Sequence, residues 1–177
     1  MQSSPKSRLF ALFILLFCLF SSFGLTLEQL RQSDLTPEKF AALFTGFEFK
    51  FHDEIQSPDT FLATASGDCD DFATLAAKVL KEKGYTTRLI AVRMPKIVHV
   101  VCYVEESHGY LDYNNRATSA LVRSESEIFQ IAGEVANSYG LSWSSASEFT
   151  REQGINRLVR TVVSPKSQKG LFAMIFK

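Results

Sequence analysis

The run Ser66–Ala73 (SGDCDDFA) places a cysteine at the predicted start of a helix. Asp68 is a residue type favoured at helix N-caps, and apolar residues recur at helical spacing from Phe72 to Lys81. Gly84 stands where a left-handed residue commonly ends a helix. The positive end of a helix dipole favours a thiolate, the nucleophilic form of cysteine. The run therefore predicts a helix that constrains and activates Cys69.

A histidine and an aspartate follow this cysteine in strand-like segments. His99 lies in an alternating run over residues 98–104, and Asp112 lies in a second such run. Ser107–Gly109 between them is typical of a turn, so the two runs are predicted to form an antiparallel hairpin. Cysteine, histidine and aspartate in this order are the parts of a cysteine-nucleophile triad.

The rest of the chain has the pattern of an α+β domain, with helices first, then a sheet, and one later helix. Gly67 is expected to supply a tight turn before the central helix. Helices are predicted over 25–34 and 36–44, from 57 and over 124–138, the last with a Ser124/Glu127 capping box. Strands are predicted over 47–51 with one buried face, over 87–93, over 157–163 and in the apolar tail 171–176.

The first 24 residues have the pattern of a signal peptide. Lys6 and Arg8 precede the uncharged stretch 9–23, and Ser22 and Gly24 are small residues at a predicted cleavage site. The uncharged stretch is shorter than the roughly 18–20 residues that span a bilayer. We therefore expect export to the periplasm or beyond the cell, a soluble mature form without a membrane span, and a single domain over residues 25–177; an uncleaved anchor is the alternative to cleavage.

Charge and cysteine content restrict the remaining classes of function. The whole chain has 19 basic and 19 acidic residues, and loss of the first 24 leaves a slight acidic excess, so nucleic-acid binding is not expected. Cys69 and Cys102 remain after processing, and a disulfide between them is an alternative in an exported protein. His99 and Cys102 are on opposite faces of the same predicted strand, which argues against that disulfide if Cys69 meets His99.

These blocks together resemble the transglutaminase-like superfamily. The matching residues are Gly67–Ala73, Gly84-Tyr85, His99 and Leu111-Asp112, within a best-matched part over 47–115. The resemblance implies a papain-like core, in which a catalytic helix packs on an antiparallel sheet. It further implies Cys69 as nucleophile, His99 as base and Asp112 as its orienting partner. The pattern is most similar to bacterial transglutaminase-like cysteine proteinases.

Several residues near the triad have more than one interpretation. Gln56 is a candidate oxyanion donor beside the Cys69 backbone N–H. Asp68, Asp70 and Asp71 correspond to positions that bind calcium in some related periplasmic proteinases; the alternative is that they cap the helix and favour its dipole. No other cofactor is implied. Asn114 and Asn115 are alternatives to Asp112.

The sequence therefore predicts an exported thiol enzyme that performs acyl transfer on a protein or peptide. Water as acceptor gives a cysteine protease or amidase, which is the preferred reading, whereas an amine gives transglutaminase-type crosslinking. A catalytically silent binding module of the same fold is the alternative from another class.

Overall fold

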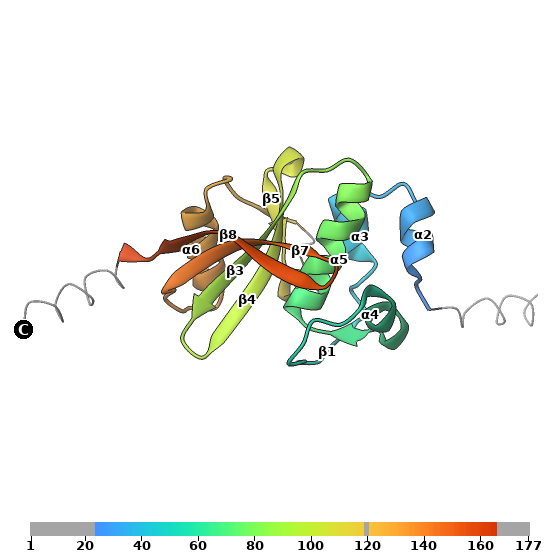
Figure 1. The fold of residues 1–177 in the computed structure, drawn as a ribbon, viewed down its shortest axis with the longest axis horizontal. Coiled ribbons are helices and arrows are strands. Elements are labelled where there is room, and N and C mark those ends of the chain that lie inside the picture. The colour runs from blue at the N-terminus through green and yellow to red at the C-terminus, as the bar shows by residue number, and fades with distance from the viewer. Residues whose placement is uncertain (1–23, 119–120, 166–177) are drawn as a thin grey trace, which may run out of the picture.

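The computed structural model describes residues 24–118 and 121–165 of the 177-residue chain (Figure 1). Its helices are α2 (Leu27–Gln32), α3 (Pro37–Ala42), α4 (Pro58–Thr64), α5 (Cys69–Glu82) and α6 (Ile128–Ser138), with short 3₁₀ turns η2 (Glu105–Ser107) and η3 (Tyr113–Asn115). Its strands are β1 (Glu48–Phe49), β2 (Ser66–Gly67), β3 (Thr87–Met94), β4 (Ile97–Val104), β5 (Gly109–Leu111), β6 (Val122–Arg123), β7 (Ser145–Glu152) and β8 (Ile155–Val163).

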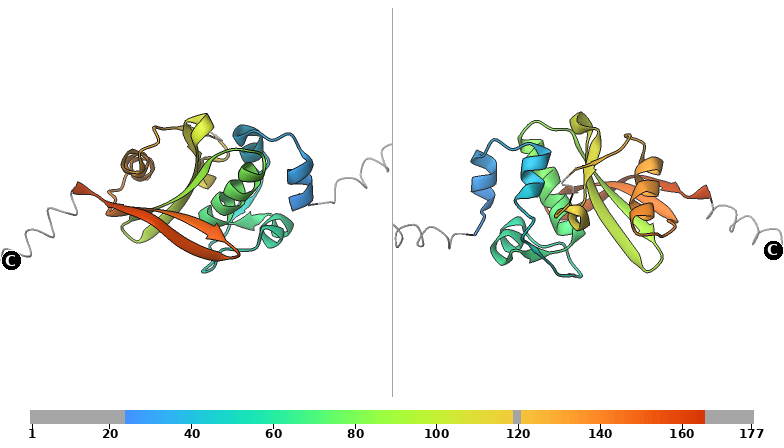
Figure 2. Two further views of the ribbon diagram at one scale, coloured as in Figure 1. Left: turned by 45° about the horizontal axis from the view of Figure 1, so that its top comes forward. Right: turned by 180° about the vertical axis from the view of Figure 1, so that it is seen from behind.

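One antiparallel sheet carries the fold, with strand order β6-β5-β4-β3-β7-β8. Helix α5 packs on one face of this sheet and α6 on the other, as the two views of Figure 2 show. Alternate residues of β4 divide between these layers: Val100 and Cys102 pack with α5, whereas Val101 and Tyr103 pack with α6. The predicted α+β class is confirmed.

The central helix α5 forms where the sequence predicted it. The Asp68 side chain accepts a hydrogen bond from the backbone of the first turn, and Asp71 completes a capping box. The apolar residues of the helix are buried, and Gly84, just beyond its end, has φ +89°. Because only a residue without Cβ adopts this conformation at little cost, the glycine ends the helix.

Aromatic side chains hold the N-terminal helices against α5. Phe40 and Phe44 of the α3 region, Phe61 of α4 and Phe72 of α5 are all buried, with ring centroids 4.8–5.7 Å apart in successive contacts. Tyr113 joins them from η3, 5.4 Å from the Phe72 ring. This aromatic cluster fixes the segment before the cysteine relative to the segment after the histidine.

Two sequence predictions on element boundaries were wrong. The strand predicted over 47–51 has only two residues, β1, which pairs with β2 outside the main sheet, so Phe49 and Phe51 stay 53% and 71% exposed. Helix α6 begins at Ile128 without a side-chain cap, because the Ser124 backbone bonds to His108 and belongs to the turn after β6.

Strand β7 had no predicted counterpart, whereas the strand predicted over 157–163 is confirmed as β8. The signal-peptide segment up to residue 23 and the tail 171–176 lie outside the described residues. Within the part of the chain that the structure describes, no helix combines the length and apolar character that crossing a membrane requires.

Candidate active site

Cys69 is the first residue of α5 and is partly exposed. Its backbone N–H is one of the first-turn amides that no carbonyl of the helix can satisfy. The Val100 backbone N–H on β4 lies 3.5 Å from Sγ of Cys69 and donates toward it. The sulfur is therefore surrounded by the positive end of a helix and a strand N–H, both of which favour a negative charge there.

His99 and Asp112 are joined by a hydrogen bond in the interior. Nε2 of His99 and Oδ1 of Asp112 are 2.9 Å apart, and both side chains are almost fully buried. His99 lies on β4 opposite Val92 of β3, and Asp112 immediately follows β5. The Asp112 carboxylate also accepts bonds from the Asn114 backbone and the Asn115 amide, at 2.9 and 3.3 Å. The two asparagines thus orient Asp112, and Asp112 is the residue that contacts His99.

The electrostatics of this pair favour a protonated imidazole. Burial lowers the pKa of His99, but hydrogen bonds to the Asp112 carboxylate and to Cys69 outweigh it and raise the pKa to about 10. Since Asp112 takes Nε2, Nδ1 is the nitrogen left to exchange a proton with the cysteine. The structure therefore brings Cys69, His99 and Asp112 together.

The two thiols Cys69 and Cys102 are free, so the disulfide alternative is not supported. The argument from strand faces was nevertheless incomplete, because Cys69 packs against the same core cluster as Cys102 and still interacts with His99. The reason is that β5 pairs with β4 only from Cys102 to Val104. The residues of β4 before Cys102 have no β5 partner, and at this edge the Val100 backbone N–H donates toward Sγ of Cys69.

Tyr139 is a site residue that sequence reasoning missed. Its hydroxyl lies 3.2 Å from Nδ1 of His99, and its ring packs edge-on against the imidazole at 5.2 Å. The Asn114 side-chain amide donates to the same hydroxyl. Burial and the nearby charge of Asp112 raise the pKa of Tyr139. The one local signal was its place at the end of a predicted helix, just before Gly140.

Gln56 does not serve as the predicted oxyanion donor in this arrangement. Its amide Nε2 donates to Oδ2 of Asp71 at 2.7 Å and to the Ser66 carbonyl at 3.1 Å, and its backbone N–H donates to Asp71 as well. With both amide hydrogens committed, Gln56 instead clamps the loop before α4 onto the first turn of α5.

The three acidic residues around Cys69 lie close together. One oxygen from each of Asp68, Asp70 and Asp71 lies within 4.8 Å of the others. Asp68 accepts bonds from the backbone N–H groups of His52 and Asp70, and Asp71 accepts from Asp68 and Gln56. These bonds give Asp68 and Asp71 a capping and clamping role, while calcium binding stays a prediction.

Asp70 differs from its two neighbours. Burial first, and then the hydrogen bond and charge of Asp68, raise the pKa of the Asp70 carboxyl to about 8, although Arg151 acts in the opposite direction. Among the described residues, Oδ1 of Asp70 has no hydrogen-bond partner. A carboxyl group that is partly protonated near neutral pH reduces the negative charge beside Cys69.

In a comparison with protein families, residues 28–116 match a model described as a transglutaminase-like domain. The chain belongs to this transglutaminase-like family. Comparison with curated proteins gives no match. Cys69, His99 and Asp112 all lie within the matched residues, whereas α6, β7 and β8 follow them. The match begins within α2, earlier than the part over 47–115 on which the sequence resemblance rested.

In this transglutaminase-like domain, His99 has one contact that comes from outside the matched residues. The family segment supplies β4 and β5, which place His99 and Asp112. Tyr139, which contacts the other nitrogen of the same imidazole, comes from beyond the matched residues. His99 and Asp112 thus lie within the matched residues, whereas Tyr139 lies beyond them.

Proposed function

We propose that this protein is an exported thiol enzyme that hydrolyses a peptide or amide bond by acyl transfer. The observation that carries the proposal is the convergence of Cys69, His99 and Asp112, with the cysteine at a helix N-terminus and the His–Asp pair buried. Family membership supports thiol-based acyl transfer as the class of chemistry. The proposal includes that this enzyme is similar to bacterial transglutaminase-like cysteine proteinases.

The reaction begins with a Cys69 thiolate beside a protonated His99. The thiolate adds to the substrate carbonyl carbon, and the backbone N–H of Cys69 faces the oxyanion that forms. Collapse of the intermediate breaks the C–N bond, and the amine leaves with the proton from Nδ1 of His99. Water then attacks the thioester, gives its proton to His99, and releases the acid and the thiolate. Asp112 holds the imidazole in position throughout.

Hydrolysis and crosslinking differ only in the acceptor that reaches the thioester. An amine that displaces water at this step gives an amide product instead of an acid. Both outcomes use the same three residues. Export to the periplasm or beyond the cell is proposed from the basic, apolar and small-residue order of the first 24 residues.

The test is the rate at which iodoacetamide alkylates Cys69 as a function of pH, with modified sites assigned by peptide mass spectrometry. An ordinary thiol titrates near pH 8.5 and is almost wholly protonated at pH 6. We expect fast alkylation of Cys69 at pH 6, slowed about 100-fold in His99→Ala. Alkylation of the wild type only above about pH 8 would contradict the thiol-enzyme proposal and favour a silent binding module.

Two controls belong to this experiment. Cys102 is fully buried, and burial raises the pKa of its thiol to about 12, so it stays unmodified in the folded protein. His108→Asn removes an exposed histidine from a turn where φ is +46°, which asparagine tolerates, and should leave the rate at Cys69 unchanged. With casein as substrate, formation of a free acid indicates hydrolysis, whereas formation of a new amide bond between chains indicates crosslinking.

A further inference from the structure

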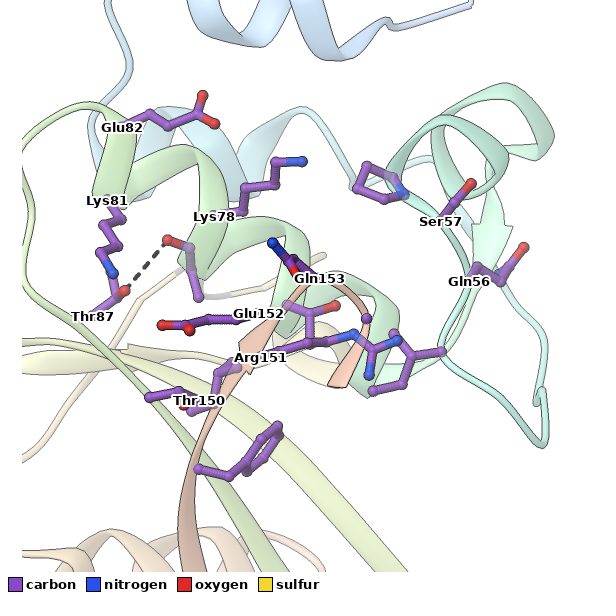
Figure 3. Close-up of a pocket in the computed structure, with 17 residues that line it drawn as sticks. Gln56, Ser57, Lys78, Lys81, Glu82, Thr87, Thr150, Arg151, Glu152 and Gln153 are labelled. Carbon is purple, nitrogen blue, oxygen red and sulfur yellow. Dashed lines mark hydrogen bonds between the residues drawn. The ribbon is translucent and has the colours of Figure 1, made fainter. Parts of the chain in front are cut away.

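A cavity of about 770 Å³ lies beside α5, on the face of the sheet that α5 covers only in part. One wall is the outer face of α5, including Thr74, Lys78 and Lys81. Opposite it lie Arg151 and Glu152 at the end of β7, followed by the turn at Gln153, as Figure 3 shows. The volume falls in the range of about 300–1,000 Å³ typical of ligand sites.

The cavity is connected to the candidate active site through shared elements. Thr74 lies in the helix that begins at Cys69, about 7.5 Å further along its axis at 1.5 Å per residue. Gln56 lines the cavity and also binds Asp71 in the first turn of α5. Arg151 lies close enough to Asp70 to lower its pKa. These shared residues place the cavity next to the first turn of α5, which begins at Cys69.

The charges of the cavity wall favour an anionic ligand. Lys78 and Lys81 are exposed, and within the described residues neither forms a salt bridge. Glu82 on the same wall is paired with Arg31 at 2.9 Å. Glu152 is the other acidic residue of the lining, so Lys78, Lys81 and Arg151 outnumber the one lining carboxylate that has no salt bridge within the described residues. Between the walls, Leu89 and Phe149 supply an apolar floor.

One wall of the cavity is not part of the family match. Helix α5 and β3 lie within residues 28–116, but β7 and β8 lie beyond them. The hairpin packs along β3 in antiparallel register, with Leu89 opposite Phe149, and so closes a space that the matched segment leaves open. This wall adds to the family domain a surface that can select a ligand.

We propose that this cavity binds the part of the substrate remote from the scissile bond, and that it takes an acidic peptide segment with apolar residues between its carboxylates. The proposal rests on the proposed function, because it assigns the cavity to the same acyl-transfer substrate. Lys78 and Lys81 on α5 and Arg151 on the hairpin contact the carboxylates, while Phe149 contacts an apolar side chain.

The experiment uses the full chain with Cys69→Ala and two fluorescein-labelled heptapeptide pools. One pool alternates Glu or Asp with Leu or Phe, and the other replaces each acid by Lys. Fluorescence anisotropy should show binding of the acidic pool alone, weakened at least about tenfold in Lys78→Glu/Lys81→Glu. Lys39→Glu reverses the charge of one lysine on a helix away from the cavity lining and should leave affinity within twofold. Equal binding of both pools, or equal affinity in the double variant, overturns the proposal.

A second readout separates this proposal from the proposed function. In the wild-type chain, the acidic pool should protect Cys69 from iodoacetamide, and the protection should disappear in the double variant. Binding without protection overturns the assignment of the cavity to the substrate. Slow alkylation at pH 6 in the absence of peptide contradicts the thiol-enzyme proposal alone, because anisotropy still reports whether the cavity selects acidic peptides.

Discussion

His99 has two ring nitrogens, and each has its own partner in the structure. Nε2 bonds to Asp112, whereas Nδ1, the nitrogen left for Cys69, lies 3.2 Å from the Tyr139 hydroxyl. Because the pKa of His99 is raised to about 10, its imidazole is protonated at pH 6, and Nδ1–H can donate to the Tyr139 oxygen. The tyrosine oxygen then competes with the Cys69 sulfur for this hydrogen.

Removal of this hydroxyl should therefore activate the cysteine. Tyr139→Phe keeps the ring that packs on His99, and we expect alkylation of Cys69 at pH 6 to become about two- to tenfold faster, the effect of one hydrogen bond. The measurement is the iodoacetamide pH profile, with Tyr85→Phe as a control at a site distant in the chain. A slower rate in Tyr139→Phe would mean that the hydroxyl supports the ion pair instead of competing with it.

At the residue scale, the order of residues along the chain predicted which catalytic side chains meet. It did not predict which other residues form hydrogen bonds with them. Cys69, His99 and Asp112 were predicted because each follows a local signal of a helix start or a strand. Tyr139 comes from the far end of α6, and no local pattern announces a contact with His99. The prediction of Gln56 as an oxyanion donor was wrong because its amide donates to Asp71 and Ser66. These bonds depend on how the loop packs, which the sequence does not show.

At the element scale, the start of α5 depends on a close approach at Gly67. The sequence predicted a tight turn at Gly67, but this residue lies in β2. A glycine is needed there because neighbouring atoms leave no room for a side chain. A Cβ at this position would lie 2.5 Å from Oδ2 of Asp71 and 2.6 Å from the Phe61 ring. Both atoms are held, one by Gln56 and the other by the aromatic cluster.

Gly67→Ala should accordingly destabilise the protein by about 1–3 kcal/mol, the usual effect of overpacking a buried site. The matched control is Gly133→Ala in α6, where an added Cβ meets nothing within 4 Å and alanine favours the helix by about 0.5–1 kcal/mol. Urea unfolding followed by circular dichroism measures both. Equal stability of Gly67→Ala and the wild type would contradict a close approach at this residue.

Elements with strong end signals were predicted well, and the others were not. Helix α5 has both a capping aspartate and a terminal glycine, and the β4–β5 hairpin has a clear turn. Strand β7 has the sequence SASEFTRE, without regular apolar alternation, and its pairing with β3 comes from tertiary contact that no local pattern encodes. The alternating phenylalanines at 47–51 do have a local strand pattern, but the predicted buried face was wrong. Strand β1 pairs with β2 outside the main sheet, so Phe49 and Phe51 stay exposed.

For the whole molecule, the buried His99–Asp112 pair makes stability depend on pH in a definite direction. The pKa of His99 is about 10 in the fold, against about 6.5 in an unfolded chain. Between these values the folded state binds more protons, so the pair's contribution is complete below about pH 6.5 and is lost as pH rises toward 10. Asp112→Asn removes the partner that raises the pKa of His99 most, and the fall in unfolding free energy from pH 7 to pH 9 should become shallower.

Asp34→Asn, at an exposed ion pair with Lys39, should keep the wild-type slope in urea titrations at each pH. Identical slopes in wild type and Asp112→Asn would show that the imidazole is not held protonated by this carboxylate, and the thiolate–imidazolium step would then lose its support as well.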